Sequence, residues 1–322
     1  MKRVYNLLVI LLVLPILTVG HWSLSEAAYP DRDIELVVPF SAGGGSHITG
    51  QIIAQIMTEE KIIPVNMPVV CKPGGAMAVG MAYTAAKKGN PHYIMLLTNS
   101  FLITPMKGGV SVNKDDFTPI VLFGSQLSLL CSNPDGQFKT LGDAVKYAKE
   151  NPGKLTIAVS GNTHQMWASM LSDSLGIELT AVPFSGTAPC ISALLGKHVD
   201  LAIVNLTEGR DFIETKKLLG LGITSKKRVD AVPDIPTFAE QGIKGNYDLF
   251  RGMVAPASIP EDARQFLGAA FKKLCESERW QKEYVDKTGF LSDPIYLDDA
   301  DRYLNETEAL YGPILKKLGI VK

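Results

Sequence analysis

Short apolar runs alternate with helical periodicity along the first third of the chain. An apolar run at 34–38 leads into a cluster of small residues, after which isoleucines recur at helical spacing. These are Ile48, Ile52, Ile53 and Ile56. Two further apolar runs, at 65–71 and 93–98, flank a helical pattern at 76–87. This alternation predicts a βαβαβ unit with a parallel sheet.

The same alternation returns in the second half of the chain. Thr140 can cap a helix that ends at Glu150, and helical patterns follow two of the later strands. The expected strands span 155–159, 178–182, 198–204 and 219–224. The pattern therefore predicts a second α/β unit.

Two segments are expected to connect these units. An apolar stretch at 117–131 crosses from the first unit to the second, and a strand at 248–254 returns. A long helix from Pro260 through Tyr284 and a last helix at 297–317 are expected to cover the first unit. We therefore expect two α/β lobes, with residues 28–126 plus 250–322 in lobe 1 and 127–249 in lobe 2.

Three strand-to-helix turns are rich in glycine and small polar residues, at 41–47, 160–164 and 185–187. Each is expected at the carboxyl end of a strand, where open α/β sheets bind ligands. Ser46 can cap its helix by accepting from a backbone N–H, and a helix N-terminus favours an anion. Turns that face each other across two lobes would form a cleft lined by N–H groups. A tight turn without a ligand is the alternative.

Composition narrows the classes of function. With 322 residues, 46% hydrophobic content, 20% charged residues and a formal net charge of −1, the chain has no basic excess that indicates nucleic-acid binding. Lys2 and Arg3 precede an apolar run at 7–19 that is short for a membrane span. This predicts a signal peptide over 1–27, cleaved after Ala27 or one residue later. An uncleaved N-terminal anchor is the alternative.

Sequence patterns for catalysis or metal binding are missing. The consecutive glycines 43–45 lack the dinucleotide spacing, no P-loop lysine follows them, and no Gly-x-Ser-x-Gly motif occurs. His47 and His164 are the histidines in glycine or serine turns, where each is either a local cap or a ligand contact. We expect no enzyme, no cofactor and no metal. The cysteines, expected as buried free thiols, are Cys71, Cys131, Cys190 and Cys275.

Blocks in a fixed order along the chain carry a family resemblance. They include Tyr29-Pro30-Asp31-Arg32, Val38-Pro39-Phe40, Gly43-Gly44-Gly45, Lys72-Pro73-Gly74-Gly75, Asp116-Phe117-Thr118-Pro119-Ile120, Asn151-Pro152-Gly153, Ser160-Gly161-Asn162, Val182-Pro183-Phe184-Ser185-Gly186-Thr187, Leu194-Leu195-Gly196-Lys197, Val232-Pro233-Asp234-Ile235-Pro236 and Arg251-Gly252. In these blocks the chain resembles the extracytoplasmic solute-binding proteins of the tripartite tricarboxylate transporters, also called Bug proteins.

The resemblance implies a two-lobed periplasmic-binding-protein (Venus-flytrap) fold, with mixed sheets flanked by helices and a ligand cleft between the lobes. It implies a periplasmic protein that captures a small organic anion, such as a di- or tricarboxylate, and delivers it to membrane permease subunits. We expect a monomer. Turns 41–47 and 184–187 would hold one carboxylate through backbone groups and water, and further residues would shape the pocket. The candidate ligand-binding residues are Ser41, Ala42, Gly43, Gly44, Gly45, Ser46, His47, Asn99, Ser100, Ser160, Gly161, Asn162, Thr163, Phe184, Ser185, Gly186, Thr187, Asn205 and Arg251.

Two departures from the family and two other functions stay open. His47 stands where the family usually carries an acid, and the turn around His164 is shorter than usual. The other functions are an exported sensor subunit and a secreted α/β hydrolase that uses a turn serine. Turnover of esters would indicate the hydrolase, and neighbouring permease genes would favour transport over sensing.

Overall fold

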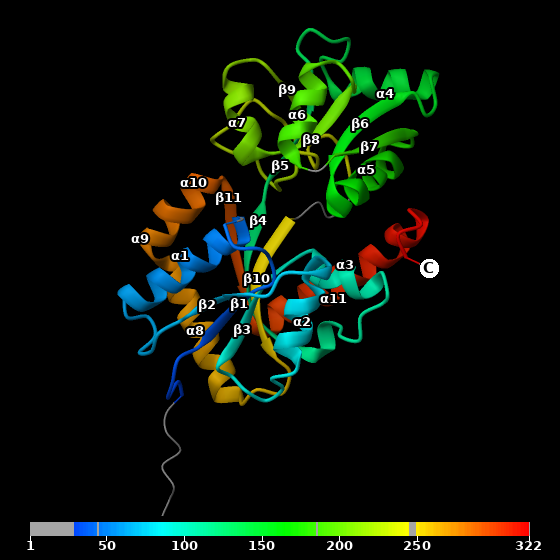
Figure 1. The fold of residues 1–322 in the computed structure, drawn as a ribbon. Helices are drawn as coiled ribbons and strands as arrows, with labels where there is room; N and C mark the ends of the chain where they lie inside the picture. The colour runs from blue at the N-terminus through cyan, green and yellow to red at the C-terminus, as the bar shows by residue number, and fades with distance from the viewer. Residues whose placement is uncertain (1–28, 44, 185, 245–248, 322) are drawn as a thin grey trace, which may run out of the picture.

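The protein forms two α/β lobes, each built on its own mixed sheet (Figure 1). The computed structural model describes residues 29–321 except 44, 185 and 245–248, and only the backbone of 161 and 162. The first sheet has the strand order β11-β4-β10-β3-β1-β2, and the second has the order β7-β6-β8-β5-β9.

The first sheet is parallel at one end and antiparallel at the other. Strand β1 is parallel to β2 and β3, whereas β10 is antiparallel to β3 and β4, and β11 is antiparallel to β4. Its strands are β1 (Glu35–Val38), β2 (Val69–Cys71), β3 (Tyr93–Thr98), β4 (Phe117–Gln126), β10 (Leu249–Pro256) and β11 (Phe290–Tyr296). β1 and β3 are apolar runs because helices cover both faces of the sheet.

The second sheet follows the same design. Strands β6, β7 and β8 are parallel, and β5 is antiparallel to β8 and β9. Its strands are β5 (Ser128–Ser132), β6 (Leu155–Ser160), β7 (Leu179–Phe184), β8 (Leu201–Asn205) and β9 (Leu219–Ile223). A single residue, Leu127, separates β4 from β5, so one nearly continuous strand runs from the first sheet into the second.

Helices enclose the first sheet from both sides. One apolar cluster joins α1 and α8 to one face, and another joins α2, α3 and α11 to the other. The helices are α1 (Gly45–Glu59), α2 (Ala78–Ala85), α3 (Ser100–Met106), α8 (Glu261–Glu276), α9 (Glu278–Trp280), α10 (Asp286–Thr288) and α11 (Leu297–Lys317), with 3-10 turns η1 (Gly75–Met77) and η2 (Lys114–Asp116) and a π-helical turn η3 (Gln281–Val285).

The second sheet is enclosed in the same way. Helices α4 and α5 pack on one face, and α6 and α7 pack on the other. They are α4 (Leu141–Glu150), α5 (Gly161–Leu175), α6 (Thr187–Leu195) and α7 (Leu206–Glu214). Thr140 caps α4 as predicted, because its hydroxyl accepts from Asp143 N–H and the Asp143 carboxylate accepts from Thr140 N–H.

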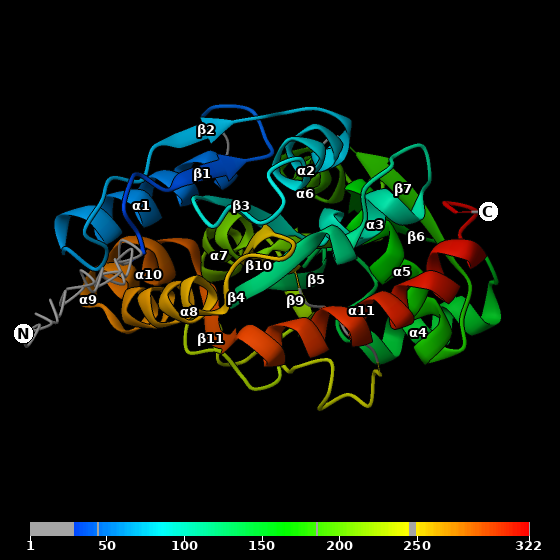
Figure 2. The same cartoon turned by 90° about the horizontal axis from the view of Figure 1, so that it is seen from below.

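Helix α11 connects the two lobes. It runs along the first sheet and reaches α5 of the second lobe (Figure 2). Tyr311 and Leu315 of α11 belong to the same apolar cluster as Trp167 and Leu171 of α5. An ion pair between Lys317 and Asp173 closes this contact. The helix expected to cover only the first lobe therefore also supports the second.

Several local predictions need correction. The strand expected at 65–71 is only Val69–Cys71, and Ile48, expected on the buried face of α1, is 53% exposed because the first turn of that helix projects past the end of β1. Helix α7 and strand β11 were not predicted. In β11, Ser292, Asp293 and Pro294 interrupt the apolar pattern.

The predicted signal peptide at 1–27 lies outside the described residues. Within the described ranges, no helix is long and apolar enough to cross a membrane. All four cysteines are free thiols; Cys131 and Cys190 are buried as predicted, whereas Cys71 and Cys275 are half-buried.

Candidate functional site

Strand register brings the candidate residues to the two sheet edges beside the crossing from β4 to β5. Arg251, near the start of β10, pairs with Thr98 at the end of β3 and with Gly124 of β4. In the second sheet, Asn205 at the end of β8 pairs with Ser128, the first residue of β5. The carboxyl ends of β1, β3, β6, β7 and β8 therefore flank the crossing, and ligands of open α/β sheets bind at such edges.

Arg251 links helix α1 to the end of strand β4 in the first lobe. Its half-buried guanidinium donates from Nη1 to Ser46 Oγ at 3.2 Å and from Nη2 to Gln126 Oε1 at 3.1 Å. Ser46 lies in the first turn of α1, and Gln126 is the last residue of β4. Ser46 is not the N-cap that the sequence predicted, because the helix already begins at Gly45 and the Ser46 hydroxyl accepts from Arg251.

His47 closes the glycine turn. Gly43 N–H donates to His47 Nδ1 at 3.2 Å, and His47 Nε2 lies 3.2 Å from Nε2 of Gln51, one helical turn further along α1. The imidazole thus accepts a backbone hydrogen bond that orders the turn after β1. Protonation at Nδ1 would remove that acceptor.

Asn205 is the centre of a hydrogen-bond network in the second lobe. Its Nδ2 donates to Thr187 Oγ1 and to Glu208 Oε2, both at 3.0 Å, and its Oδ1 accepts from Ser128 Oγ at 3.2 Å. The side chain of Asn205 also hydrogen-bonds the His164 ring. Both amide protons are therefore used within the protein, where Asn205 orients its neighbours.

His164 is a buried histidine that contacts Ser160. His164 is 3% exposed in the first turn of α5, and burial lowers its pKa to about 4, with the Asn205 hydrogen bond opposing that shift. Nδ1 of the ring lies 2.7 Å from the Ser160 hydroxyl oxygen, so His164 and Ser160 share one hydrogen bond within the protein.

Thr187 is a buried residue, 4% exposed, with a hydroxyl that can donate. It is the first residue of α6, and its Oγ1 accepts from Asn205, which leaves the hydroxyl proton for another acceptor. Among the described residues, no oxygen accepts that proton. The first N–H groups of α6 are also unpaired by helix geometry. A hydroxyl donor beside a helix N-terminus suits a carboxylate.

The other candidate residues lie around this frame. Asn99 is 1% exposed and its Nδ2 donates to Tyr311 OH at 2.6 Å, so it points toward α11. Ser41, Ala42, Gly43 and Gly45 are exposed, whereas Ser100, Thr163, Phe184 and Gly186 are half-buried. Gly44 and Ser185 lie outside the described residues, and only the backbone of Gly161 and Asn162 is described. The turn expected at 160–164 is wrong, because β6 passes directly into α5 at Gly161.

Sequence reasoning missed three residues of this frame. Gln126 and Ser128 hold Arg251 and Asn205, and Glu208 places a carboxylate beside Asn205. Gln126 and Ser128 are polar residues that interrupt the apolar segment at the crossing, and that interruption was the available signal.

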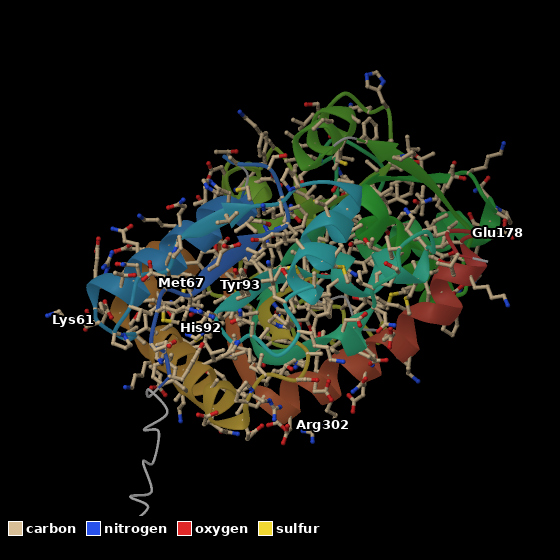
Figure 3. The ribbon with its side chains drawn as sticks, turned by 60° about the horizontal axis from the view of Figure 1, so that its bottom comes forward. Lys61, Met67, His92, Tyr93, Glu178 and Arg302 are labelled. Atoms are coloured by element: carbon tan, nitrogen blue, oxygen red, sulfur yellow. The ribbon has the colours of Figure 1, made fainter. Side chains whose placement is uncertain are left out.

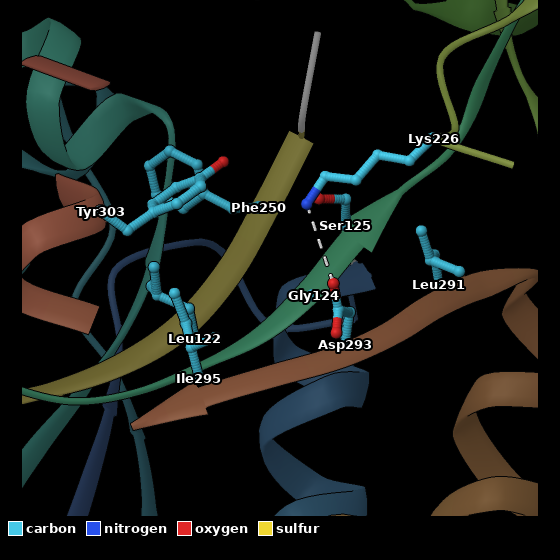
Figure 4. A pocket seen from close by; sticks show the side chains of 9 residues that line it. All are labelled: Leu122, Gly124, Ser125, Lys226, Phe250, Leu291, Asp293, Ile295 and Tyr303. Carbon is cyan, nitrogen blue, oxygen red and sulfur yellow. Dashed lines mark ion pairs between the residues drawn. The ribbon is translucent and has the colours of Figure 1, made fainter. Parts of the chain in front are cut away.

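A separate cavity lies on the opposite face of β10 (Figure 4). It has a volume of about 140 Å³, and its lining includes Leu122, Phe250 and Tyr303. Phe250 precedes Arg251 on β10, so the two side chains point to opposite faces of the strand. At this cavity, Lys226 of the second lobe lies 3.9 Å from Asp293 of β11. None of the candidate ligand-binding residues lines it. In the part of the chain that the structure describes, no group of three His, Cys, Asp or Glu residues could hold a metal ion.

Two α/β lobes joined at a strand crossing, with polar groups on both facing sheet edges, define a periplasmic binding protein. A TctC solute-binding protein from Polaromonas, solved without a ligand, has this fold with a TM-score of 0.82 and 26% identity over 90% of this chain and 99% of that chain. The tripartite tricarboxylate transporter family receptor profile matches residues 52–320. The chain belongs to this family of receptors.

Two further proteins resemble this chain, one in sequence and one in fold. A UPF0065 protein of Pseudomonas sp. (strain P51) is 30% identical over 252 residues, which is 76% of this chain and 74% of that protein. An R. palustris protein in complex with adipate shares the fold with a TM-score of 0.71 and 24% identity over 91% of this chain and 99% of that chain.

Proposed function

We propose that this protein captures a small carboxylated solute between its lobes in the periplasm and delivers it to the permease subunits of a tripartite tricarboxylate-type transporter. The observation that carries the proposal is the Thr187 hydroxyl, which Asn205 orients as a donor at the N-terminus of α6. Membership of the receptor family supports it. The adipate bound to the R. palustris protein gives an example of the solute class.

The charges around the two sheet edges favour an anion. Arg251 supplies a guanidinium from the first lobe, and the N-termini of α1 and α6 supply partial positive charge. Glu208 opposes an anion close to Asn205. A carboxylate is therefore expected beside Thr187, on the side of α6 away from Glu208.

The contact between Ser160 and His164 raises a second candidate, hydrolysis by a serine nucleophile. A distance of 2.7 Å is within reach for a general base. However, a histidine with a pKa of about 4 is a weak base near neutral pH. The group that orients it is an amide, which stabilises an imidazolium less than a carboxylate does. Solute binding therefore explains this pair better, and a sensor subunit would share the same ligand chemistry.

A thermal-shift series tests the proposal. The panel contains acetate, butyrate, succinate, malate, adipate and citrate, and a solute at a hundred times its dissociation constant should add about 2.7 kcal/mol of stability. Thr187→Val should weaken binding of the solute that stabilises the wild type, whereas Thr187→Ser keeps the hydroxyl and serves as the matched control. No stabilisation by any carboxylate would overturn the proposal. Release of nitrophenolate from p-nitrophenyl acetate that Ser160→Ala abolishes would favour the hydrolase instead.

A further inference from the structure

The cavity on the far side of β10 from Arg251 combines an apolar floor with a charged mouth (Figure 4). Leu122 and Phe250 line its floor and are 3% and 1% exposed. The Lys226 and Asp293 side chains at its mouth are 77% and 68% exposed. A neighbouring hollow of about 450 Å³ shares these two charged residues, so the cavity can be reached from solvent past the ion pair. Apolar walls with a few polar groups are typical of a site for a small molecule.

The volume of this cavity fits one aromatic ring. It is about 140 Å³, and an apolar cavity of about 150 Å³ in another protein stays dry and binds benzene. Phe250 and Tyr303 meet edge to face beside it, with 5.9 Å between the ring centroids and 87° between the ring planes. A third ring can pack against such a pair in the same preferred geometries. The apolar part of a ligand is therefore expected to be a single ring.

The two charges at the mouth fit a neutral head group. Lys226 Nζ and Asp293 Oδ2 are 3.9 Å apart, too far for a hydrogen bond, so each can still bond to a ligand. An anionic head group would be repelled by Asp293, and a cationic head group would be repelled by Lys226. A hydroxyl can accept from the ammonium and donate to the carboxylate at the same time. A neutral ligand also enters apolar surroundings without the cost of desolvating a charge.

We propose that this cavity is a second binding site, for a neutral molecule of the phenol class. The ring of the ligand lies beside Phe250 and Tyr303, and its hydroxyl lies between Lys226 and Asp293. Lys226 belongs to the second lobe and the other three residues belong to the first, so a bound phenol contacts both lobes. The inference goes beyond the proposed function, because it concerns another face of β10 and a ligand without a carboxylate.

Calorimetric titration of the ligand-free protein with four single-ring compounds tests the choice of head group. Phenol is compared with toluene, which replaces the hydroxyl by a methyl group, and with benzoate and benzylamine, which carry a negative and a positive charge. Phenol is expected to bind with a dissociation constant of roughly 1 mM or less, and the other three compounds about fivefold or more weakly. No saturable binding of phenol up to about 10 mM would overturn the proposal.

Other orders of affinity overturn it as well. Toluene that binds as tightly as phenol would show that the cavity recognises a ring and no head group. Benzoate that binds more tightly than phenol would show a site for anions at Lys226, and tighter binding of benzylamine would show a site for cations at Asp293.

Filling the cavity tests where phenol binds. Leu291→Phe adds a ring to the lining and should weaken phenol roughly tenfold or more. Its melting temperature should stay the same or rise, because empty space accepts the larger side chain without overpacking. The matched control is Leu195→Phe, at a residue that is 37% exposed at the end of α6, and it should bind phenol like the wild type. Unchanged phenol affinity in Leu291→Phe would show that phenol binds elsewhere.

Removing the ammonium tests the contact with the hydroxyl. Lys226→Met keeps an apolar side chain of similar length, and it should weaken phenol roughly fivefold while toluene binds as before. Lys61→Met makes the same change at an exposed residue that follows α1 in the first lobe (Figure 3) and does not line the cavity. It should bind phenol like the wild type. Equal losses of phenol and toluene in Lys226→Met would contradict the proposal, and this variant gives the readout if Leu291→Phe does not fold.

The same calorimetric method separates this site from the carboxylate site. The carboxylate that stabilises the wild type is titrated alongside phenol, and Thr187→Val should weaken the carboxylate and leave phenol binding unchanged. Loss of phenol binding in Thr187→Val would place phenol in the carboxylate site and overturn the inference. If phenol binds as expected and no carboxylate binds the wild type, only the proposed function fails.

Discussion

At the scale of single residues, the direction of a hydrogen bond, more than the residue type, decides which side chain can still donate to a solute. Asn205 is a plausible solute contact by sequence, yet Thr187 and Glu208 accept both of its amide protons. Its effect on a solute is indirect, through the buried Thr187 hydroxyl, whose oxygen accepts from Asn205. His164 likewise engages the Ser160 hydroxyl within the protein. The bonds that join Asn205 to Ser128 and to Thr187 link residues far apart in the chain, so no local motif predicts the network.

The buried His164 predicts a pH dependence of stability. Its pKa is about 4 in the folded protein, and an unfolded histidine titrates near 6.5. Between these pH values His164 is protonated in the unfolded chain and neutral in the folded chain. The free energy of unfolding is therefore highest above about pH 6.5 and falls as the pH drops toward 4. The shift corresponds to about 3 kcal/mol, which is lost across that window. Urea denaturation at pH 7, 6, 5 and 4.5 measures it.

Two variants separate His164 from the other titrating groups. The pKa of His92 is also lowered, first by burial, so part of the slope belongs to that residue. His164→Gln should reduce the slope between pH 6.5 and 4, whereas His198→Gln, at an exposed histidine, should keep it. A slope that His164→Gln leaves unchanged would show that His164 does not titrate as a buried neutral group.

At the scale of elements, hydrophobic periodicity predicts the helices and strands that are determined by local sequence. The strand at 93–98, the last helix at 297–317 and the Thr140 cap agree with the structure, because each has an uninterrupted pattern or a capping box. The start of α5 was expected a few residues after Gly161, and helix α7 and strand β11 were missed, since tertiary pairing forms them against weak local signals. The strand ends beside the candidate site were also predicted from periodicity. The crossing segment was predicted too, but the hydrogen bonds of Gln126 to Arg251 and of Ser128 to Asn205 were not.

Helix α2 packs closely against Pro39, just before the glycine turn that follows β1, and this contact can be tested. A Cβ built at Gly80 would lie 2.5 Å from Pro39 Cβ and 3.0 Å from its Cα. Gly80→Ala should therefore push the chain that leads into the glycine turn away from α2. We expect a loss of roughly 1–3 kcal/mol of stability, as for other overpacked sites. A weaker solute affinity should accompany it, measured by the same titrations.

Gly142 in α4 is the matched control for this substitution. The nearest atom to its built Cβ, the Thr140 hydroxyl oxygen, lies at 3.6 Å, in ordinary contact. Gly142→Ala should leave stability unchanged or raise it by up to about 1 kcal/mol, because alanine favours a helix. Similar effects at both glycines would show that helix propensity, and not contact with Pro39, decides the outcome.

At the scale of the whole molecule, connections of two kinds join the lobes. The crossing from β4 to β5 and the contact between α11 and α5 are packed and apolar. The pair Lys226–Asp293, on the opposite face of β10 from Arg251, joins side chains that are 77% and 68% exposed. Domain closure in two-lobed proteins rotates the lobes about a few linking residues. A rotation about the crossing that closes the Arg251 side would separate Lys226 from Asp293.

This geometry predicts that weakening the outer pair favours the closed form. Asp293→Lys replaces an attraction by a repulsion on that face, which should pivot the lobes toward each other on the Arg251 side. Exposed ion pairs contribute up to about 1 kcal/mol, so solute affinity should rise roughly twofold to fivefold. Asp135→Lys makes the same change of charge at an exposed turn of the second lobe and should leave affinity unchanged. Small-angle scattering should show a smaller radius of gyration for the wild type when solute is bound, and a ligand-free Asp293→Lys variant shifted in that direction. If the radius stays constant at saturating solute, or if both variants bind alike, the lobes do not pivot about the crossing.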